Sequence, residues 1–156
     1  MDAKFATFVE SLAPKLAELI AMPPLKYGSL PLDMPKSGVY LFSEKQRHLY
    51  VGRSNTLRQR HGRHCRPGAT HRQAAFAFLL AREQTGLTTA SYRAGEGSRA
   101  GLMEQPAFRD AFIASKGRIR EMEYRFVEET DQTCQALLEI YCAVVLGTPY
   151  NDFGTH

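Results

Sequence analysis

The side chains that could do chemistry begin with two tyrosines, Tyr40 and Tyr50. Aliphatic residues flank each of them at alternate positions, which predicts two short strands, Val39 to Phe42 and His48 to Val51. If those aliphatic residues face the core, both tyrosines emerge together on the opposite side. A tyrosine hydroxyl can accept a proton only where nearby positive charge favours its ionisation. The alternative is that both rings are there for their high strand propensity.

Glycines and basic residues accompany these tyrosines. Gly38 precedes the first predicted strand and Gly52 follows the second, which allows close approach of a ligand to the backbone, although turn geometry explains them equally well. Arg60 and His64 lie four residues apart on a predicted helix and so share a face, with Arg53 about two turns upstream. The alternative for His64 is a buried structural histidine, but the polar helix predicts that it is not deeply buried.

Glu139 is a carboxylate inside the last predicted helix, which is apolar almost all round and is therefore predicted to be a core helix. Among buried neighbours a carboxylate is costly unless it is paired or bound to metal. Its functional interpretation is a hard oxygen ligand for Mg²⁺ or Mn²⁺ on a rigid element. The alternative is a salt bridge or a narrow solvent-facing strip of the helix.

The positive charge of the chain is concentrated between Lys45 and Arg72. This window holds eight of the 20 lysine and arginine residues and four of the five histidines, but no aspartate or glutamate. Ordinary solvated faces, the alternative, usually interleave both signs. Arginine grips phosphate with two parallel hydrogen bonds, so the window predicts a nucleic-acid partner. The predicted nucleic-acid contacts are Arg53, Arg58, Arg63, Arg66, His71 and Arg72.

The elements that must position these residues follow from periodicity and from turn signals. We expect an α+β fold, with a β-hairpin followed by several helices and a late strand around 122–126. Pro106 predicts a late start or a break in the helix over 102–115. The predicted helices cover about 4–21, 55–64, 72–83, 102–115 and, capped by Asp131 and stopped by Gly147, 132–146, with an irregular excursion over 84–100.

Composition bounds the class of protein. The chain has 156 residues, 44% of them hydrophobic, which is the size and balance of one globular domain. Apolar runs such as 140–146 are far too short for a membrane span, and no secretory signal is visible. Three cysteines without a C-x-x-C pair favour neither a disulfide framework nor structural zinc, so a cytoplasmic location is expected.

The ordered set of residues resembles a known pattern. Gly38-Val39-Tyr40 and Tyr50-Val51-Gly52 are similar to the paired motif of the GIY-YIG nuclease superfamily, and an arginine, a histidine, a late glutamate and an asparagine follow in order. The resemblance covers residues 38–72 and 118–156 and implies a small three-stranded antiparallel sheet flanked by helices. By this likeness the active-site set is Tyr40, Tyr50, Arg60, His64, Glu139 and Asn151, with Arg53 at a position that is often basic.

Two departures from the smallest members of this superfamily concern layout. Residues 1–35 form an N-terminal helical extension, and a long stretch before residue 118 predicts an insertion at about 84–117 within a single domain over 1–156. These additions resemble the restriction-endonuclease branch more than the minimal repair or homing modules. No separate DNA-binding domain is expected.

The expected function is therefore a DNA endonuclease that uses Mg²⁺ or Mn²⁺ at a single active site. Glu139 would hold the metal, Arg60 would stabilise charge on the phosphate, and Tyr40 or Tyr50 would accept the proton of the attacking water. His64 is an alternative base. A nucleic-acid-binding module without catalysis and a structural domain remain the competing hypotheses. Duplex or single-stranded DNA, and the oligomeric state, are left open.

Overall fold

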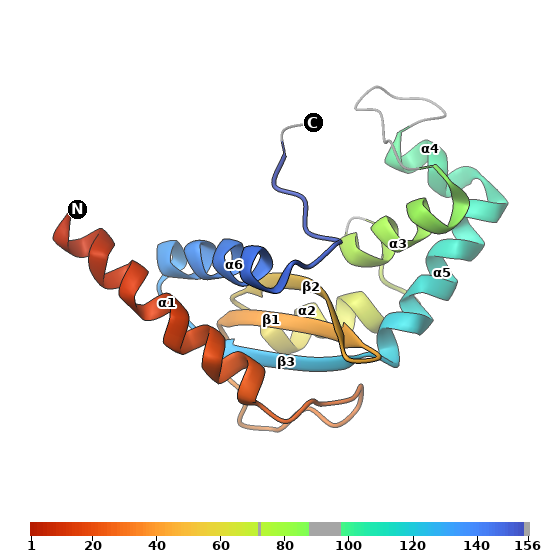
Figure 1. The fold of residues 1–156 in the computed structure, drawn as a ribbon. Coiled ribbons are helices and arrows are strands. Elements are labelled where there is room, and N and C mark those ends of the chain that lie inside the picture. Colours follow the sequence, from red (N-terminus) through yellow and green to blue (C-terminus); the bar gives the residue numbers. More distant parts are fainter. Residues whose placement is uncertain (72, 88–97, 155–156) are drawn as a thin grey trace. The chain divides into compact units, whose positions relative to one another are not determined.

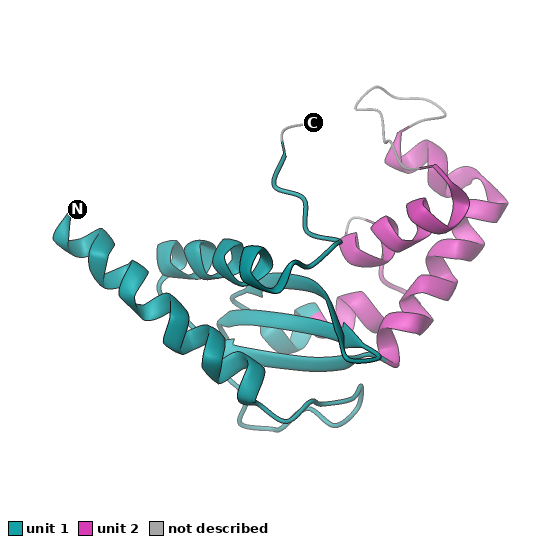
Figure 2. Ribbon diagram, viewed as in Figure 1, with its two compact units in different colours: residues 1–60, 122–156 teal, residues 61–121 magenta. Residues whose placement is uncertain are grey.

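The computed structural model describes residues 1–71, 73–87 and 98–154, and these residues form six helices and one three-stranded antiparallel sheet (Figure 1). The expected α+β class is confirmed. The chain divides into two compact units (Figure 2). Unit 1 comprises Met1–Arg60 and Met122–His156, and unit 2 comprises His61–Glu121. The single domain over 1–156 stays a prediction, as does its insertion at about 84–117, which falls within unit 2.

The sheet of unit 1 has β1 (Gly38–Glu44) at its centre, between β2 (Arg47–Ser54) and β3 (Glu123–Glu128). Each strand is antiparallel to its neighbour, so the predicted hairpin is present. Its connection is a two-residue turn in which Lys45 and Gln46 have φ values of 53° and 65°. Two consecutive left-handed residues are typical of a type I′ turn, whose twist matches that of the strands.

Helices α1 (Ala3–Ala21) and α6 (Gln132–Leu146) lie side by side on one face of this sheet (Figure 1). They bury a core with Val39, Leu41 and Val51 of the hairpin. The predicted ends of α6 are confirmed, because Asp131 accepts a hydrogen bond from the Cys134 N–H (2.9 Å) and Gly147 ends the helix at φ 64°. The core holds Leu12, Leu16, Leu19, Val39, Leu41, Val51, Val127, Cys134, Leu138, Cys142 and Ala143.

The expectation that α6 is buried almost all round is wrong. Ile140, Val144 and Val145 are 44%, 71% and 54% exposed, so the helix uses only one face to cover the sheet. Apolar residues on the outer face of α6 made this helix look hydrophobic on all sides in the sequence, but they do not contribute to this core.

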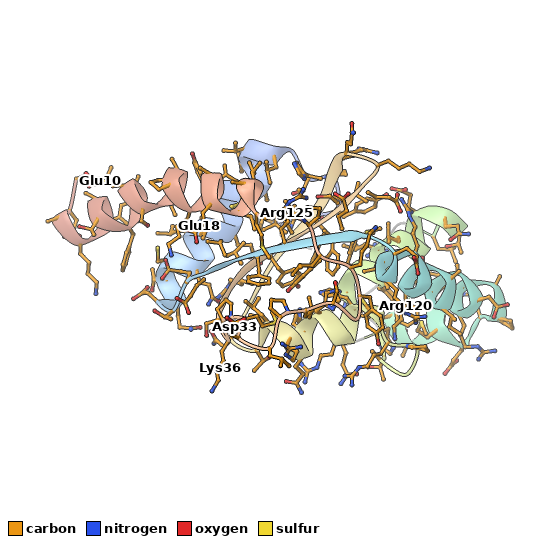
Figure 3. The ribbon with its side chains drawn as sticks, turned by 90° about the horizontal axis from the view of Figure 1, so that it is seen from below. Glu10, Glu18, Asp33, Lys36, Arg120 and Arg125 are labelled. Carbon is orange, nitrogen blue, oxygen red and sulfur yellow. The ribbon has the colours of Figure 1, made fainter. Side chains whose placement is uncertain are left out.

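The N-terminal extension packs as part of unit 1. After α1 the chain pairs Leu25 with Tyr124 of β3 in an isolated bridge. Arg125, also on β3, donates from Nε to the Met22 carbonyl (2.8 Å) and so holds the end of α1 against the strand (Figure 3). Among the described residues, none of the helices is long and apolar enough to cross a membrane.

Most of unit 2 is helical. Helix α2 (Leu57–Cys65) begins in unit 1 and continues into unit 2, where α3 (Ala75–Thr85), α4 (Arg99–Glu104) and α5 (Pro106–Arg120) follow. The predicted break at Pro106 is confirmed, because this residue opens α5 directly after α4 has ended. Of the expected irregular excursion, residues 88–97 lie outside the described residues.

A buried cation anchors the segment that follows α2. Lys116 of α5 is fully buried, and its Nζ donates to the Ala69 carbonyl (2.7 Å). Burial lowers the pKa of Lys116 to about 8, and Arg120 acts in the same direction. One turn further along α5, Arg120 donates to the Cys65 carbonyl (2.8 Å), at the end of α2.

Candidate active site

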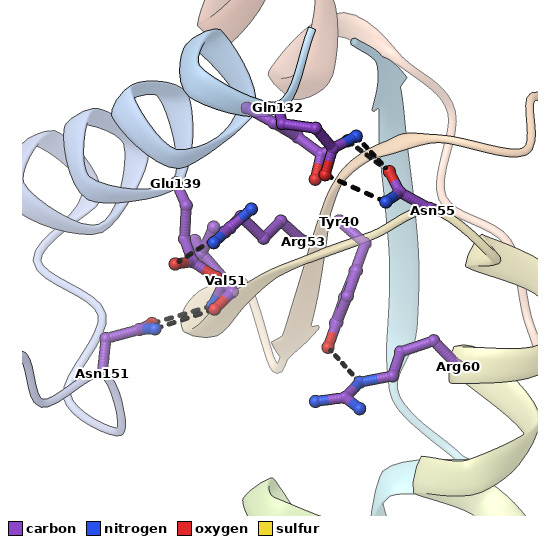
Figure 4. A network of polar contacts seen from close by, with 9 residues as sticks. Tyr40, Val51, Arg53, Asn55, Arg60, Gln132, Glu139 and Asn151 are labelled. Carbon is purple, nitrogen blue, oxygen red and sulfur yellow. Dashed lines mark hydrogen bonds and ion pairs between the residues drawn. The ribbon is translucent and has the colours of Figure 1, made fainter. Parts of the chain in front are cut away.

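Unit 1 holds most of the predicted active-site residues (Figure 4). Tyr40 lies on β1 and Tyr50 on β2, Arg60 on α2, and Glu139 on α6. Asn151 follows α6 near the end of the chain.

The two tyrosines share one face of the sheet, as strand alternation predicts. Their ring centroids are 6.4 Å apart. Tyr40 is 1% exposed, however, because it lies on the central strand and its ring packs beside those of Phe42 (5.8 Å) and Tyr124 (5.9 Å). Tyr50, on the edge strand β2, is only half-buried and is therefore the one with more access to water.

The two motif glycines make room for protein atoms. Gly52 is the register partner of Tyr40, and a Cβ on it would lie 2.2 Å from the Tyr40 hydroxyl. A Cβ on Gly38 would lie 2.0 Å from the Val127 carbonyl oxygen of β3. Close approach is thus the reason for both glycines, but the approaching groups are a tyrosine ring and a neighbouring strand. The ligand and turn explanations are unnecessary.

Arg60 connects the tyrosines to the carboxylate electrostatically. Its Nε donates to the Tyr40 hydroxyl at 3.5 Å, a long hydrogen bond. Burial alone would lower the pKa of Arg60, but Tyr40, Tyr50 and Glu139 outweigh burial and raise it. The guanidinium therefore stays charged in a partly buried place, where its field acts strongly.

Burial raises the pKa of both tyrosines, Tyr40 well above the usual value, and Arg60 opposes that shift only in part. The positive charge of Arg60 therefore does not bring either pKa below its usual value, whereas a tyrosine base requires that its ionisation be favoured. The condition set for a tyrosine base is thus not met by Arg60 alone, and the role of the tyrosines stays a prediction.

Glu139 projects from α6 toward β2. Its Oε1 lies 3.9 Å from the Arg53 Nε, a pair whose side chains are 21% and 40% exposed. Burial raises the pKa of Glu139, while Arg53 and Arg60 act in the opposite direction. Both features weighed as the alternative from the sequence are present, because the carboxylate is paired with Arg53 and its side chain is 21% exposed.

Asn151 contacts the backbone of β2 at both ends of its amide. Its Oδ1 accepts from the Val51 N–H (2.8 Å) and its Nδ2 donates to the Val51 carbonyl (2.7 Å). The Thr148 hydroxyl donates to the same Oδ1 (2.7 Å). Asn151 therefore fastens the chain after α6 to the strand that carries Tyr50.

His64 lies in unit 2 and is fully buried, which makes the expectation from its polar helix wrong. Its ring packs against Phe76 of α3 at 6.4 Å between centroids. The polar residues on the outer side of α2 made the whole helix look solvent-exposed in the sequence, although its inner face packs in unit 2.

The predicted nucleic-acid contacts differ in exposure. Arg53 and Arg58 in unit 1 and Arg66 in unit 2 are exposed, whereas Arg63 and His71 are half-buried. Arg58 hydrogen-bonds the Pro31 carbonyl, and the Arg66 Nε donates to the Gly62 carbonyl (3.4 Å). Arg72 lies outside the described residues.

A divalent metal would have few protein ligands here. In residues 1–71, 73–87 and 98–154 no group of three or more histidine, cysteine, aspartate or glutamate side chains is arranged to hold an ion. Mg²⁺ needs no such cage, because it keeps several waters and commonly binds through one or two carboxylates plus substrate phosphates. Glu139, a partly exposed carboxylate on a helix, fits that donor set.

Sequence reasoning missed one group beside these residues. Asn55, Gln132 and Gln135 join their side-chain amides between the end of β2 and the start of α6. A signal was present, since Gln132, Gln135 and Glu139 recur at helical spacing along a mostly apolar helix.

A small antiparallel sheet with two tyrosines and an arginine on one side is the nuclease-type fold that the motifs implied. Residues 36–90 match the family model of the GIY-YIG catalytic domain, which confirms the resemblance to the GIY-YIG superfamily over that part of the chain. The matched range includes both tripeptides, Arg60 and His64, but neither Glu139 nor Asn151. No curated protein and no solved structure matches the chain.

Proposed function

We propose that this protein is a divalent-metal-dependent endonuclease that hydrolyses phosphodiester bonds in DNA. Members of the GIY-YIG superfamily are generally endonucleases and typically need a divalent metal. The observation that carries the proposal is the electrostatic coupling of Arg60 to Tyr40, Tyr50 and Glu139 within unit 1. Those are the groups that hydrolysis of a phosphodiester requires: a cation for the phosphate, a hydroxyl for the water and a carboxylate for a metal.

Arg60 stabilises the negative charge that develops on the phosphate. It is half-buried and its Nε is oriented by the Tyr40 hydroxyl, so little reorganisation is needed when a phosphate arrives. We assign Tyr40 a positioning role on this ground, because the residue is only 1% exposed and its hydroxyl already accepts from Arg60.

Tyr50 orients the attacking water and takes its proton. It is the more accessible tyrosine, and Arg60 lowers its pKa against the larger effect of burial. Because that pKa lies above its usual value in the free protein, the active ionised fraction grows as the pH rises through 10. His64 is buried in unit 2, and the proposal gives it no proton transfer.

Glu139 would hold the metal ion through its carboxylate. When bound, such an ion polarises the phosphoryl oxygen and stabilises the leaving oxygen. Arg53 competes with any cation for the same carboxylate, since its Nε lies 3.9 Å from Oε1. We infer that Arg53 turns toward the substrate phosphate when the carboxylate is engaged by a metal. Either Mg²⁺ or Mn²⁺ satisfies this role.

Exposed arginines supply the binding energy for the nucleic-acid backbone. Arg53 and Arg58 in unit 1, and Arg66 in unit 2, add positive charge that steers a polyanion to the chain. We also propose a cytoplasmic location, in keeping with three free thiols, Cys65, Cys134 and Cys142.

Cleavage of labelled DNA tests the proposal. Purified protein is incubated with duplex and with single-stranded DNA in Mg²⁺, in Mn²⁺ or in EDTA. We expect cuts that require metal and that Glu139→Gln abolishes, while DNA binding stays within a few-fold of wild type. Glu10→Gln, which changes an exposed glutamate on α1, is the matched control. Binding without cleavage in either metal would instead support a nucleic-acid-binding module.

A further inference from the structure

Helix α6 carries a polar stripe along an otherwise apolar surface. Gln132, Gln135 and Glu139 follow at intervals of three and four residues, so they lie on one face of the helix. Gln135 is 1% exposed, and a buried amide is costly unless it is hydrogen-bonded. The two glutamines, one and two turns before the proposed metal ligand, therefore need a physical reason.

Asn55 supplies the partner for both glutamines (Figure 4). Its Nδ2 donates to the Gln132 Oε1 (2.9 Å), and the Gln132 Nε2 donates back to the Asn55 Oδ1 (2.8 Å). The Gln135 Nε2 donates to the same Oδ1 (3.2 Å) and to the Glu129 carbonyl (2.9 Å). Asn55, Gln132 and Gln135 are called the amide cluster below.

The amide cluster connects the segments that carry the candidate active site. Asn55 lies between β2, which carries Tyr50 and Arg53, and α2, which carries Arg60. The two glutamines lie on α6 before Glu139, and the Glu129 N–H donates to the Ser37 carbonyl just ahead of β1 (3.1 Å). One set of hydrogen bonds thus reaches the ends of β2 and β3, the chain before β1, and the start of α6.

We propose that the amide cluster positions Glu139 against Arg53 and Arg60, and that Asn55 and Gln132 are therefore positioning residues of the nuclease. This inference rests on the proposed function. The Arg53–Glu139 ion pair cannot fix that separation, because it is 3.9 Å long and partly exposed, and such pairs are weak. The amides of the cluster are uncharged, so their hydrogen bonds are less sensitive to salt than the ion pair is.

The cluster also remains intact when the ion pair is broken. The proposed reaction requires Glu139 to leave Arg53 for a metal, and a carboxylate released in this way would otherwise drift with its helix. A displacement of about 1 Å at a catalytic group can lower the rate by about 10²-fold. The expected consequence of losing the cluster is a slower chemical step at unchanged affinity for DNA.

Single-turnover cleavage of wild type, Asn55→Ala and Gln132→Ala tests the proposal, with Gln59→Ala as the control. Gln59 is an exposed glutamine on α2 outside the cluster. We expect the two cluster variants to cut about 10-fold to 100-fold more slowly and to need several-fold more Mg²⁺ for half-maximal rate. Their dissociation constants for DNA should stay within about two-fold of wild type, and Gln59→Ala should match wild type throughout.

The reciprocal bond between Asn55 and Gln132 allows a rescue. The double variant Asn55→Gln/Gln132→Asn keeps both amides and the combined side-chain length, so we expect it to recover most of the lost rate. The side-chain amide signals of Gln132 in ¹⁵N NMR spectra should shift in Asn55→Ala, which reports the contact independently of any cleavage. Urea titrations confirm that each variant is folded under the assay conditions.

The outcomes separate two failures. If wild-type protein cuts no DNA in any metal, the proposed nuclease function is wrong, whatever the amide spectra show. If wild type cuts and the folded cluster variants cut at the same rate, the positioning role is wrong. A changed cleavage-site preference at an unchanged rate would also overturn it, because the amides would then contact bases.

Discussion

Gly52→Ala adds one methyl group at the register partner of Tyr40. The new Cβ would lie 2.2 Å from both Cζ and the hydroxyl oxygen of that ring. Ordinary contact begins at 3.4 Å, so the ring must move by about 1.2 Å. Tyr40 cannot move outward freely, because the rings of Phe42 and Tyr124 pack beside it at 5.8 and 5.9 Å between centroids.

Two separate losses follow from that displacement. Overpacking a buried site costs about 1–3 kcal/mol, which for a chain of this length lowers Tm by a few degrees to about 10 °C. The Tyr40 hydroxyl also leaves Arg60, whose Nε is already 3.5 Å away, so the guanidinium loses the group that orients it. We expect the rate of the chemical step to fall by about 10²-fold.

Thermal melts and single-turnover cleavage on the same preparation measure both losses, with the assay run at least 20 °C below Tm. Gly117→Ala is the matched control, because a Cβ at this α5 position meets no atom within 4 Å. Replacing a helical glycine there should stabilise by up to about 1 kcal/mol and leave cleavage unchanged. A Gly52→Ala protein with wild-type Tm and wild-type rate would refute the packing of Tyr40 over Gly52.

Three further predictions follow. Tyr50→Phe should lose nearly all cleavage activity, and its remaining rate should not increase as the pH rises through 10. Tyr40→Phe should fold and keep a measurable cleavage rate that still increases with pH. Equal cleavage rates for Tyr50→Phe and wild type would contradict the assignment of Tyr50 as the base. Arg53→Gln removes a charge that lowers the pKa of Glu139, so the acid limb of the pH–rate profile should move to higher pH. Lys116 has a pKa of about 8 when folded and about 10.5 when unfolded, so the unfolded state binds more protons between these values. The free energy of unfolding of wild type should therefore rise by up to about 3 kcal/mol relative to that of Lys116→Met between pH 8 and pH 10.5, as measured by urea titration at each pH.

Local patterns predicted the elements of unit 1 well. Alternation put both tyrosines on one face, and the two-residue turn at Lys45 and Gln46 closes the hairpin between them. Asp131 and Gly147 marked the ends of α6, because a cap hydrogen bond and a left-handed residue are decided within a few positions of the chain.

Burial was less predictable, because it depends on which elements become neighbours. Tyr40 is buried and Tyr50 is not, since β1 is the central strand of the order β2-β1-β3. No pattern near Tyr40 in the sequence predicts that β3, which lies more than 80 residues later, pairs with the strand that carries Tyr40. His64 was misjudged for the same reason, because Phe76 reaches it from another helix.

The position of Glu139 shows most clearly what spacing along the chain leaves undetermined. The sequence indicated a carboxylate on an apolar helix. It did not indicate how far that carboxylate lies from Arg53 or which residues hold it there. On the proposal made above, that distance depends on contacts such as Asn55 with Gln132, across 77 residues, and Val51 with Asn151, across 100. Both contacts are amide hydrogen bonds that flank the Arg53–Glu139 pair, one at each end of the site (Figure 4). In the proposed mechanism, these neutral amide bonds would keep the frame around Glu139 in place while the carboxylate exchanges Arg53 for a metal ion.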